Sequence, residues 1–132
     1  IDLGYPDPAA ERALLKGVSR RDMIEGLAPA TTLESLLSLQ QAVGGVHASD
    51  ALLDYLQALL RFTRQSNRYA FGLSPRAGLA LLKSAQAWAL MSDRAQVLPE
   101  DVQAVLPAVC GHRLHGPDGA SVDTLIDAVP IP

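Results

Sequence analysis

The stretch GLSPRAGLALLKSAQAWALM, residues 72–91, predicts one long helix and decides the fold class of the chain. Ser74 is suited to cap the free N–H groups at the helix start, and Pro75 suits the first helical position. Apolar residues then recur at helical spacing along two sides of the segment. They are Leu79, Leu82, Ala89 and Leu90 with Gln86 on one side, and Leu81, Ala85 and Trp88 on the other. This wide apolar surface predicts a central, largely buried helix with Trp88 in the core.

Arg76 falls in the first turn of this predicted helix. The N–H groups of a first turn lack helical partners and carry the positive end of the helix dipole, so this turn is suited to meet an anion. A guanidinium beside it could bond a phosphate through its fork of donors. The alternative interpretation is an exposed arginine that pairs with a nearby carboxylate. The position alone does not choose between the two.

Composition indicates one helical domain. The chain has 132 residues, of which 48% are hydrophobic, and leucine and alanine dominate the apolar positions without the alternation typical of strands. We therefore expect an all-α fold, a small helical bundle. The chain starts at Ile1 rather than at a methionine, which suggests an excerpt from a longer protein.

Charge and hydropathy argue against two classes of partner. Eleven basic and 14 acidic residues give a formal charge of -3, without the basic stripe that nucleic-acid binding needs. The apolar runs fall short of the roughly 20 residues of a membrane span. Cys110 is the single cysteine and cannot form an internal disulfide, so we expect a cytoplasmic location. We expect neither nucleic acid nor a membrane as a partner.

Cap signals predict the helices of the first half. Asp7 and Pro8 are expected to start a helix that ends near Gly17, and Ser19 to cap a brief turn. A further helix is expected from Thr32, with residues 44 and 45, both glycine, as its left-handed stop.

Cap signals and apolar spacing also predict the helices of the second half. Ser49 is expected to open the clearest amphipathic helix, whose apolar stripe runs over residues 52–60. Pro99 is expected to start another helix that Pro107 bends, and Ser121 to cap a last short one.

The candidate chemistry is sparse. The sequence contains no phosphate-binding glycine loop, nucleophile elbow or paired-histidine zinc motif, so we expect the isolated domain to be inactive as an enzyme. Cys110, His112 and His115 form a Cys-x-His-x-x-His cluster, but three ligands are fewer than a structural zinc site uses. A buried thiol followed by histidines near a helix end is the simpler interpretation, so we expect no metal.

Several motifs occur together in a fixed order: IDLGYPDP at 1–8, SDALLDY at 49–55, GLSPRA at 72–77, LPEDV at 98–102 and HRL at 112–114. Together they resemble the C-terminal lid domain of MoxR-type AAA+ ATPases. The resemblance covers nearly the whole chain to Leu114 and weakens beyond Gly116. It implies residues 1–6 as a hinge from an α/β nucleotide-binding core outside this chain, 7–115 as the lid, and 116–132 as a tail with a short helix.

The resemblance also implies a site. Arg76 takes the place of the second sensor, which reaches the γ-phosphate of ATP held with Mg²⁺ by the core. Ser74 and Pro75 present it, and Tyr5 in the hinge is near the adenine; without the resemblance, Tyr5 is better interpreted as a packed anchor for the linker. No tight binding of ATP to this chain alone is expected, because one arginine and one helix end supply few contacts.

The family implies partners as well. Its members form hexameric rings, in which a lid packs on a neighbouring core, and act as chaperone-like motors that mature other proteins, many with a von Willebrand factor A partner. The alternative interpretation is a free-standing adaptor whose stripe at 52–60 binds a partner helix or peptide.

Two positions depart from the family pattern. Leu98 stands where a small or hydroxyl residue is common, which removes a cap contributing about 1 kcal/mol. Leu73 stands where a small residue is usual and is expected to add bulk near the phosphate-facing turn.

Overall fold

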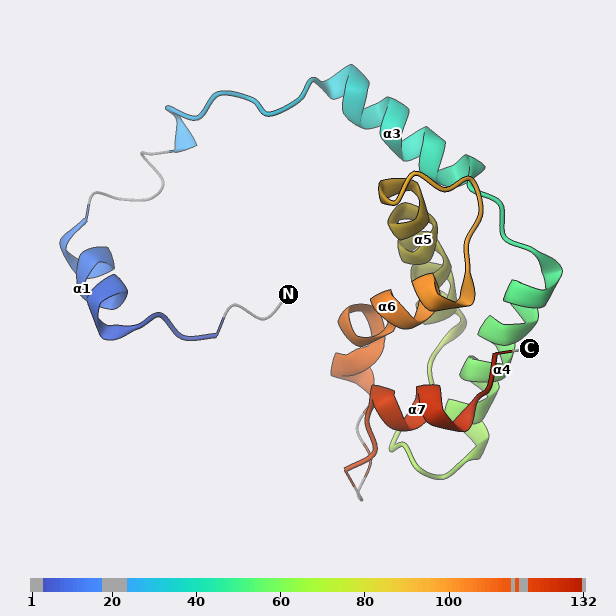
Figure 1. Cartoon of the computed structure of the whole chain (residues 1–132). Coiled ribbons are helices and arrows are strands. Elements are labelled where there is room, and N and C mark those ends of the chain that lie inside the picture. Colours follow the sequence, from blue (N-terminus) through green and yellow to red (C-terminus); the bar gives the residue numbers. More distant parts are fainter. Residues whose placement is uncertain (1–3, 18–23, 115, 117–118, 132) are drawn as a thin grey trace. The chain divides into compact units, whose positions relative to one another are not determined.

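The computed structural model describes residues 4–17, 24–114, 116 and 119–131. The chain divides into two compact units, residues 1–36 and 37–132 (Figure 1). Every regular element among the described residues is helical, apart from one isolated bridge between His47 and Gln96. This confirms the all-α prediction.

The first unit contains helix α1 (Pro8–Lys16). As expected, Asp7 caps it: its Oδ1 accepts hydrogen bonds from the N–H groups of Ala9 and Ala10, at 2.9 and 2.8 Å. The helix ends at Gly17, and none of its residues is buried. The turn expected at Ser19 lies outside the described residues.

Helix α3 (Leu33–Gly45) corrects a predicted helix end. Thr32 starts it as expected, with its hydroxyl accepting from the N–H of Ser35 at 3.1 Å. The helix continues through Gly44 and Gly45, and neither glycine has a positive φ, so the predicted left-handed stop is wrong. Glycine permits the left-handed region without requiring it.

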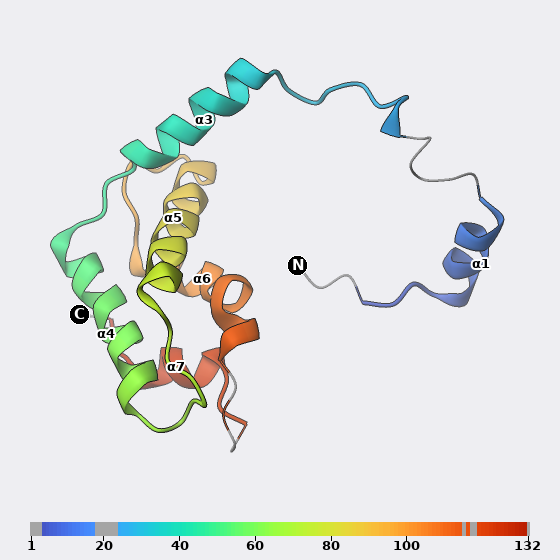
Figure 2. The ribbon, with the colours of Figure 1, turned by 180° about the vertical axis from the view of Figure 1, so that it is seen from behind.

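The second unit contains the bundle of α4 (Asp50–Gln65), α5 (Pro75–Met91) and α6 (Pro99–Cys110), then a 3₁₀ turn (Gly111–Arg113) and α7 (Val122–Ala128). Helix α5 packs chiefly against α6 and also against α4. Helix α7 packs on α4 and α6, as the two opposite views show (Figures 1 and 2).

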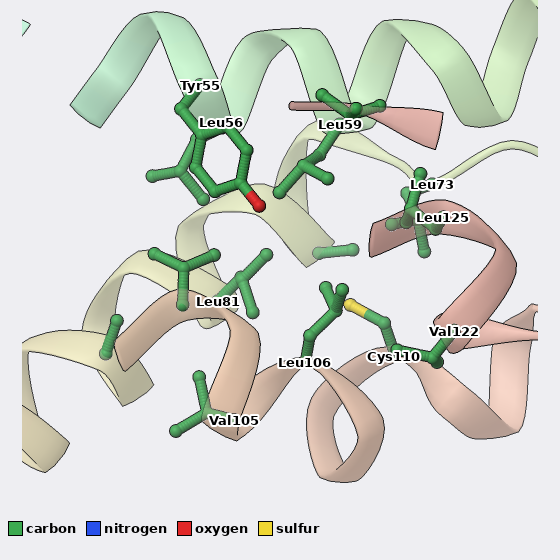
Figure 3. Packing of buried hydrophobic residues seen from close by; sticks show 14 of the residues in the cluster. Tyr55, Leu56, Leu59, Leu73, Leu81, Val105, Leu106, Cys110, Val122 and Leu125 are labelled. Atoms are coloured by element: carbon green, nitrogen blue, oxygen red, sulfur yellow. The ribbon is translucent and has the colours of Figure 1, made fainter. Parts of the chain in front are cut away.

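The core of the bundle draws residues from all four helices (Figure 3). Tyr55 and Leu59 of α4 pack with Leu81 of α5, Leu106 of α6 and Leu125 of α7, and all five are at most 1% exposed. Such residues are close-packed, which holds the helix ends in fixed positions.

Helix α5 buries one side rather than two. Ala77, Leu81, Ala85 and Ala89, spaced four residues apart, are at most 1% exposed. Trp88 is 46% exposed and Leu79 is 67% exposed, so the prediction of Trp88 in the core is wrong. The alanine-rich side lets neighbouring helices approach closely, and the indole lies on the other side of the helix.

Helix α6 starts without a capping side chain on Leu98, as its sequence predicts. Asp101 compensates, because its carboxylate accepts from the N–H of Leu98 at 2.8 Å. Both terminal NH groups of Arg94 donate to the same carboxylate. The helix then runs through Pro107 to Cys110.

The tail contains the short helix that the sequence predicts, α7. Val122 and Leu125 lie in the bundle core, and the hydroxyl of Tyr69 donates to the carbonyl of Ser121 at 2.9 Å. The helix is therefore part of the bundle. Among the described residues, no helix has both the length and the apolar character needed to cross a membrane.

Candidate functional site

The start of α5 carries the candidate site. Ser74 is the N-cap, and its Oγ accepts from the N–H of Ala77 at 3.2 Å, as predicted. Pro75 is the first residue of the helix and Arg76 the second. The helix is 17 residues long, so its dipole places positive potential at this end.

Arg76 is exposed, and within the described part of the chain its side chain forms no hydrogen bond or ion pair. The alternative interpretation, in which Arg76 pairs with a nearby carboxylate, therefore does not hold among the described residues. A charged guanidinium beside a positive helix end lacks compensation, and this arrangement favours an anion.

The segment before Ser74 is held by two side chains of α4. Thr63 accepts a hydrogen bond from the N–H of Leu73, with Oγ1 and N at 3.0 Å. Arg64 donates from its Nε to the carbonyl of Leu73 at 2.8 Å. No local sequence signal marks Thr63 and Arg64 for this role, because the contact joins positions that only the tertiary fold brings together.

The side chain of Leu73 is 2% exposed and packs in the core (Figure 3). The expectation that it adds bulk near the phosphate-facing turn is therefore wrong. The side chain of Leu73 fills the interior between the helices, while its backbone N–H and C=O groups face α4.

Gly72 lies unusually close to α4. A Cβ atom there would meet Cα of Arg64 at 2.9 Å and Cγ at 2.5 Å. Glycine is thus the residue that lets this loop approach the helix.

Tyr5 belongs to the first unit and is fully exposed there. The first unit does not itself bury the ring, and the interpretation of Tyr5 as a packed anchor stays a prediction. Its expected place near adenine stays a prediction.

Cys110 is buried in the core, as the simpler interpretation expected. Burial raises the pKa of its thiol, although the charge of Arg113 lowers it, so the thiolate needed for metal binding is disfavoured. His112 accepts from Nε of Arg113 at 2.9 Å. His115 lies outside the described residues, and among those described no cluster of His, Cys, Asp and Glu suits a metal ion.

A groove of about 730 Å³ lies between α4 and α5. Its lining includes Leu53, Leu60 and Leu79 and the arginines Arg61 and Arg64, with no acidic side chain among the described lining residues. Leu53, Leu56 and Leu60 of the stripe at 52–60 line this groove. Leu52 and Leu59 are at most 2% exposed and are not among its lining residues.

Comparison with known proteins places the bundle in a family context. The family model described as the AAA lid domain matches residues 61–129, which include the start of α5 and α7. The chain is 36% identical to "Uncharacterized protein YeaC" of Bacillus subtilis over 114 residues, covering 86% of this chain and 36% of that protein. It is 34% identical to "Chaperone MoxR1" of Mycobacterium tuberculosis over 125 residues, covering 86% and 32%.

A solved structure gives the same picture. The "putative ATPase" from Cytophaga hutchinsonii superimposes with a TM-score of 0.76 at 25% identity, covering 100% of this chain and 46% of that one. The chain spans about a third of the length of the curated relatives it matches.

Proposed function

The chain belongs to the AAA lid domain family, as the lid of a MoxR-type AAA+ ATPase, and we propose on that premise that Arg76 is its second sensor. In this role Arg76 bonds the γ-phosphate of ATP that a core domain outside this chain holds. The observation that carries the proposal is the exposed guanidinium at the capped start of α5, which has no hydrogen bond or ion pair to any residue that the structure describes.

The chemistry suits phosphoryl transfer. A guanidinium stays protonated at any working pH and forks onto two phosphate oxygens. It can stabilise the charge that spreads over the γ-phosphate oxygens as the phosphoryl group leaves. Mg²⁺ would be held by the core, because no acidic cluster suited to it occurs among the described residues.

Arg76 would also couple the nucleotide state to the lid. Its bonds to the γ-phosphate exist with ATP and are lost with ADP. ATP therefore stabilises the lid position in which Arg76 reaches the γ-phosphate, and ADP does not. Residues 1–6 act as the hinge in this proposal, and the exposed ring of Tyr5 is available to the adenine.

The whole protein is proposed to be a cytoplasmic hexameric ring. Each lid would contact the core of a neighbouring subunit, and ATP hydrolysis would drive chaperone-like maturation of client proteins, with a von Willebrand factor A protein as partner. The relative named as a chaperone supports this assignment.

The test is ATP turnover by the full-length protein with Arg76→Ala. Turnover should fall by at least about tenfold, because charge stabilisation at the transferred phosphoryl group is lost. Lys83→Ala is the matched control, since it removes another exposed positive charge from α5. Unchanged turnover in a folded Arg76→Ala protein would contradict the sensor role.

The groove between α4 and α5 favours a second candidate function, that of an adaptor. Its leucines and its two arginines fit one occupant, an amphipathic helix with leucine on one face and acidic residues beside it. A synthetic helical peptide with leucine on one face and glutamate beside it should bind the chain, and Leu79→Asp in the chain should weaken this binding. If a peptide with lysine in place of glutamate binds equally well, this adaptor function is excluded.

A further inference from the structure

Two consecutive residues of α4 form hydrogen bonds with the backbone N–H and C=O groups of Leu73. Thr63 takes the N–H and Arg64 the carbonyl, at 3.0 and 2.8 Å. Neither group of Leu73 has a partner within a helix, because the residue precedes the N-cap of α5. The segment between the two helices thus has fixed polar partners at its last residue before the cap.

The hydroxyl of Thr63 has a defined orientation. It donates to the carbonyl of Leu60 at 2.8 Å, which leaves its lone pairs for the N–H of Leu73. The side chain is 2% exposed, so water cannot replace either partner. Buried groups of this kind impose geometry, because an unpaired N–H or hydroxyl there is costly.

The aliphatic stem of Arg64 adds a steric constraint. It lies against Gly72, where even a Cβ atom would come within 2.5 Å of its Cγ. Residues 72 and 73 are therefore held against α4 both by packing and by hydrogen bonds. Ser74, Pro75 and Arg76 follow directly, so the first turn of α5 takes its position from this contact.

We propose that Thr63 and Arg64 are positioning residues, which fix the start of α5 so that Arg76 meets the terminal phosphate in one geometry. The inference rests on the proposed sensor role of Arg76. An error of about 1 Å in the placement of a catalytic group can cost on the order of a hundredfold in rate, so a loosened helix start is expected to slow turnover.

The experiment is a double-mutant cycle on ATP turnover by the full-length protein. Thr63→Val removes the acceptor at nearly constant shape and should reduce turnover by about tenfold, whereas Thr63→Ser keeps the hydroxyl and should restore most of it. In an Arg76→Ala background, Thr63→Val should cost less than about twofold, because the group that it positions is already absent.

Arg64→Met provides a second route, since it keeps an aliphatic stem at an exposed site and loses the guanidinium, with its donors and its charge. Arg64→Met should reduce ATP turnover as Thr63→Val does, and the reduction should again nearly vanish in the Arg76→Ala background. Circular dichroism checks that each variant is folded. Equal losses with and without Arg76, or full turnover in both single variants, would overturn the inference. If Arg76→Ala alone leaves turnover unchanged, the sensor role itself fails, and the two failures are distinguishable.

Discussion

Three arginines of the bundle differ in what they bind. Arg94 forms a bidentate ion pair with the buried carboxylate of Asp101, and Arg64 donates to the carbonyl of Leu73. Arg76 has no such partner among the residues that the structure describes. The first two therefore have local structural partners, and the third is the one available to a phosphate.

Asp101 gives a pH-dependent prediction at the residue scale. The hydrogen bond from Arg94, and next the N–H of Leu98, hold the pKa of its carboxyl below the usual value of 3.8, although burial raises it. The carboxylate therefore stabilises the fold above that usual value, and the stabilisation is lost as pH falls through the lowered pKa. Asp101→Asn should reduce the free energy of unfolding at pH 7 by about 1–3 kcal/mol.

Urea unfolding at pH 7 and at about pH 3 checks this prediction. The difference between wild type and Asp101→Asn should narrow in acid, because below the usual pKa of 3.8 the unfolded chain binds a proton that the folded carboxylate binds only at lower pH. An exposed carboxylate, Asp54→Asn, is the control and should change little at either pH. An unchanged difference for Asp101→Asn at the two pH values would contradict the assigned cause.

At the scale of elements, α7 shows that the tail belongs to the bundle. The helix has only seven residues, too few to be stable alone in water. Leu125 is fully buried against the other helices, and the hydroxyl of Tyr69 fixes the carbonyl at its start. Its stability therefore comes from packing.

Leu125→Ala tests this account of α7. The variant should lose about 2–5 kcal/mol of stability, because it leaves a cavity in a close-packed core. Asp127→Ala, an exposed position on the same helix, should change stability by less than about 0.5 kcal/mol. The measurement is urea unfolding of both variants. Equal, small effects would show that α7 is not a core element.

Helix starts could be predicted from the sequence, whereas helix ends could be predicted only in part: α1 ends at Gly17 as expected, but α3 does not stop at Gly44 in a left-handed turn. Asp7, Ser49 and Ser74 accept from the N–H groups that their sequence positions predict, because capping depends on neighbours in the chain. The left-handed residues near helix ends are Asn67 and Asp93, whereas the predicted glycines remain helical. Either residue type can adopt that conformation, and packing decides where it occurs.

At the scale of the whole molecule, the sequence predicted the bundle and the position of Arg76, but not what holds it. The all-α class followed from composition and apolar spacing, which are properties of the chain. The bonds from Thr63 and Arg64 to Leu73 depend on the crossing of α4 and α5. The exposure of Trp88 likewise depends on which side of α5 the neighbouring helices cover.

If Arg76 senses the γ-phosphate, its loss must change the affinity of the full-length protein for ATP more than its affinity for ADP. Arg76→Ala should weaken ATP binding by roughly tenfold and ADP binding by less than about twofold, because one charge-assisted contact to the γ-phosphate is lost. Competition against a fluorescent nucleotide measures both affinities in wild type and variant. Equal changes for ATP and ADP, or no change for either, would show that Arg76 does not sense the γ-phosphate.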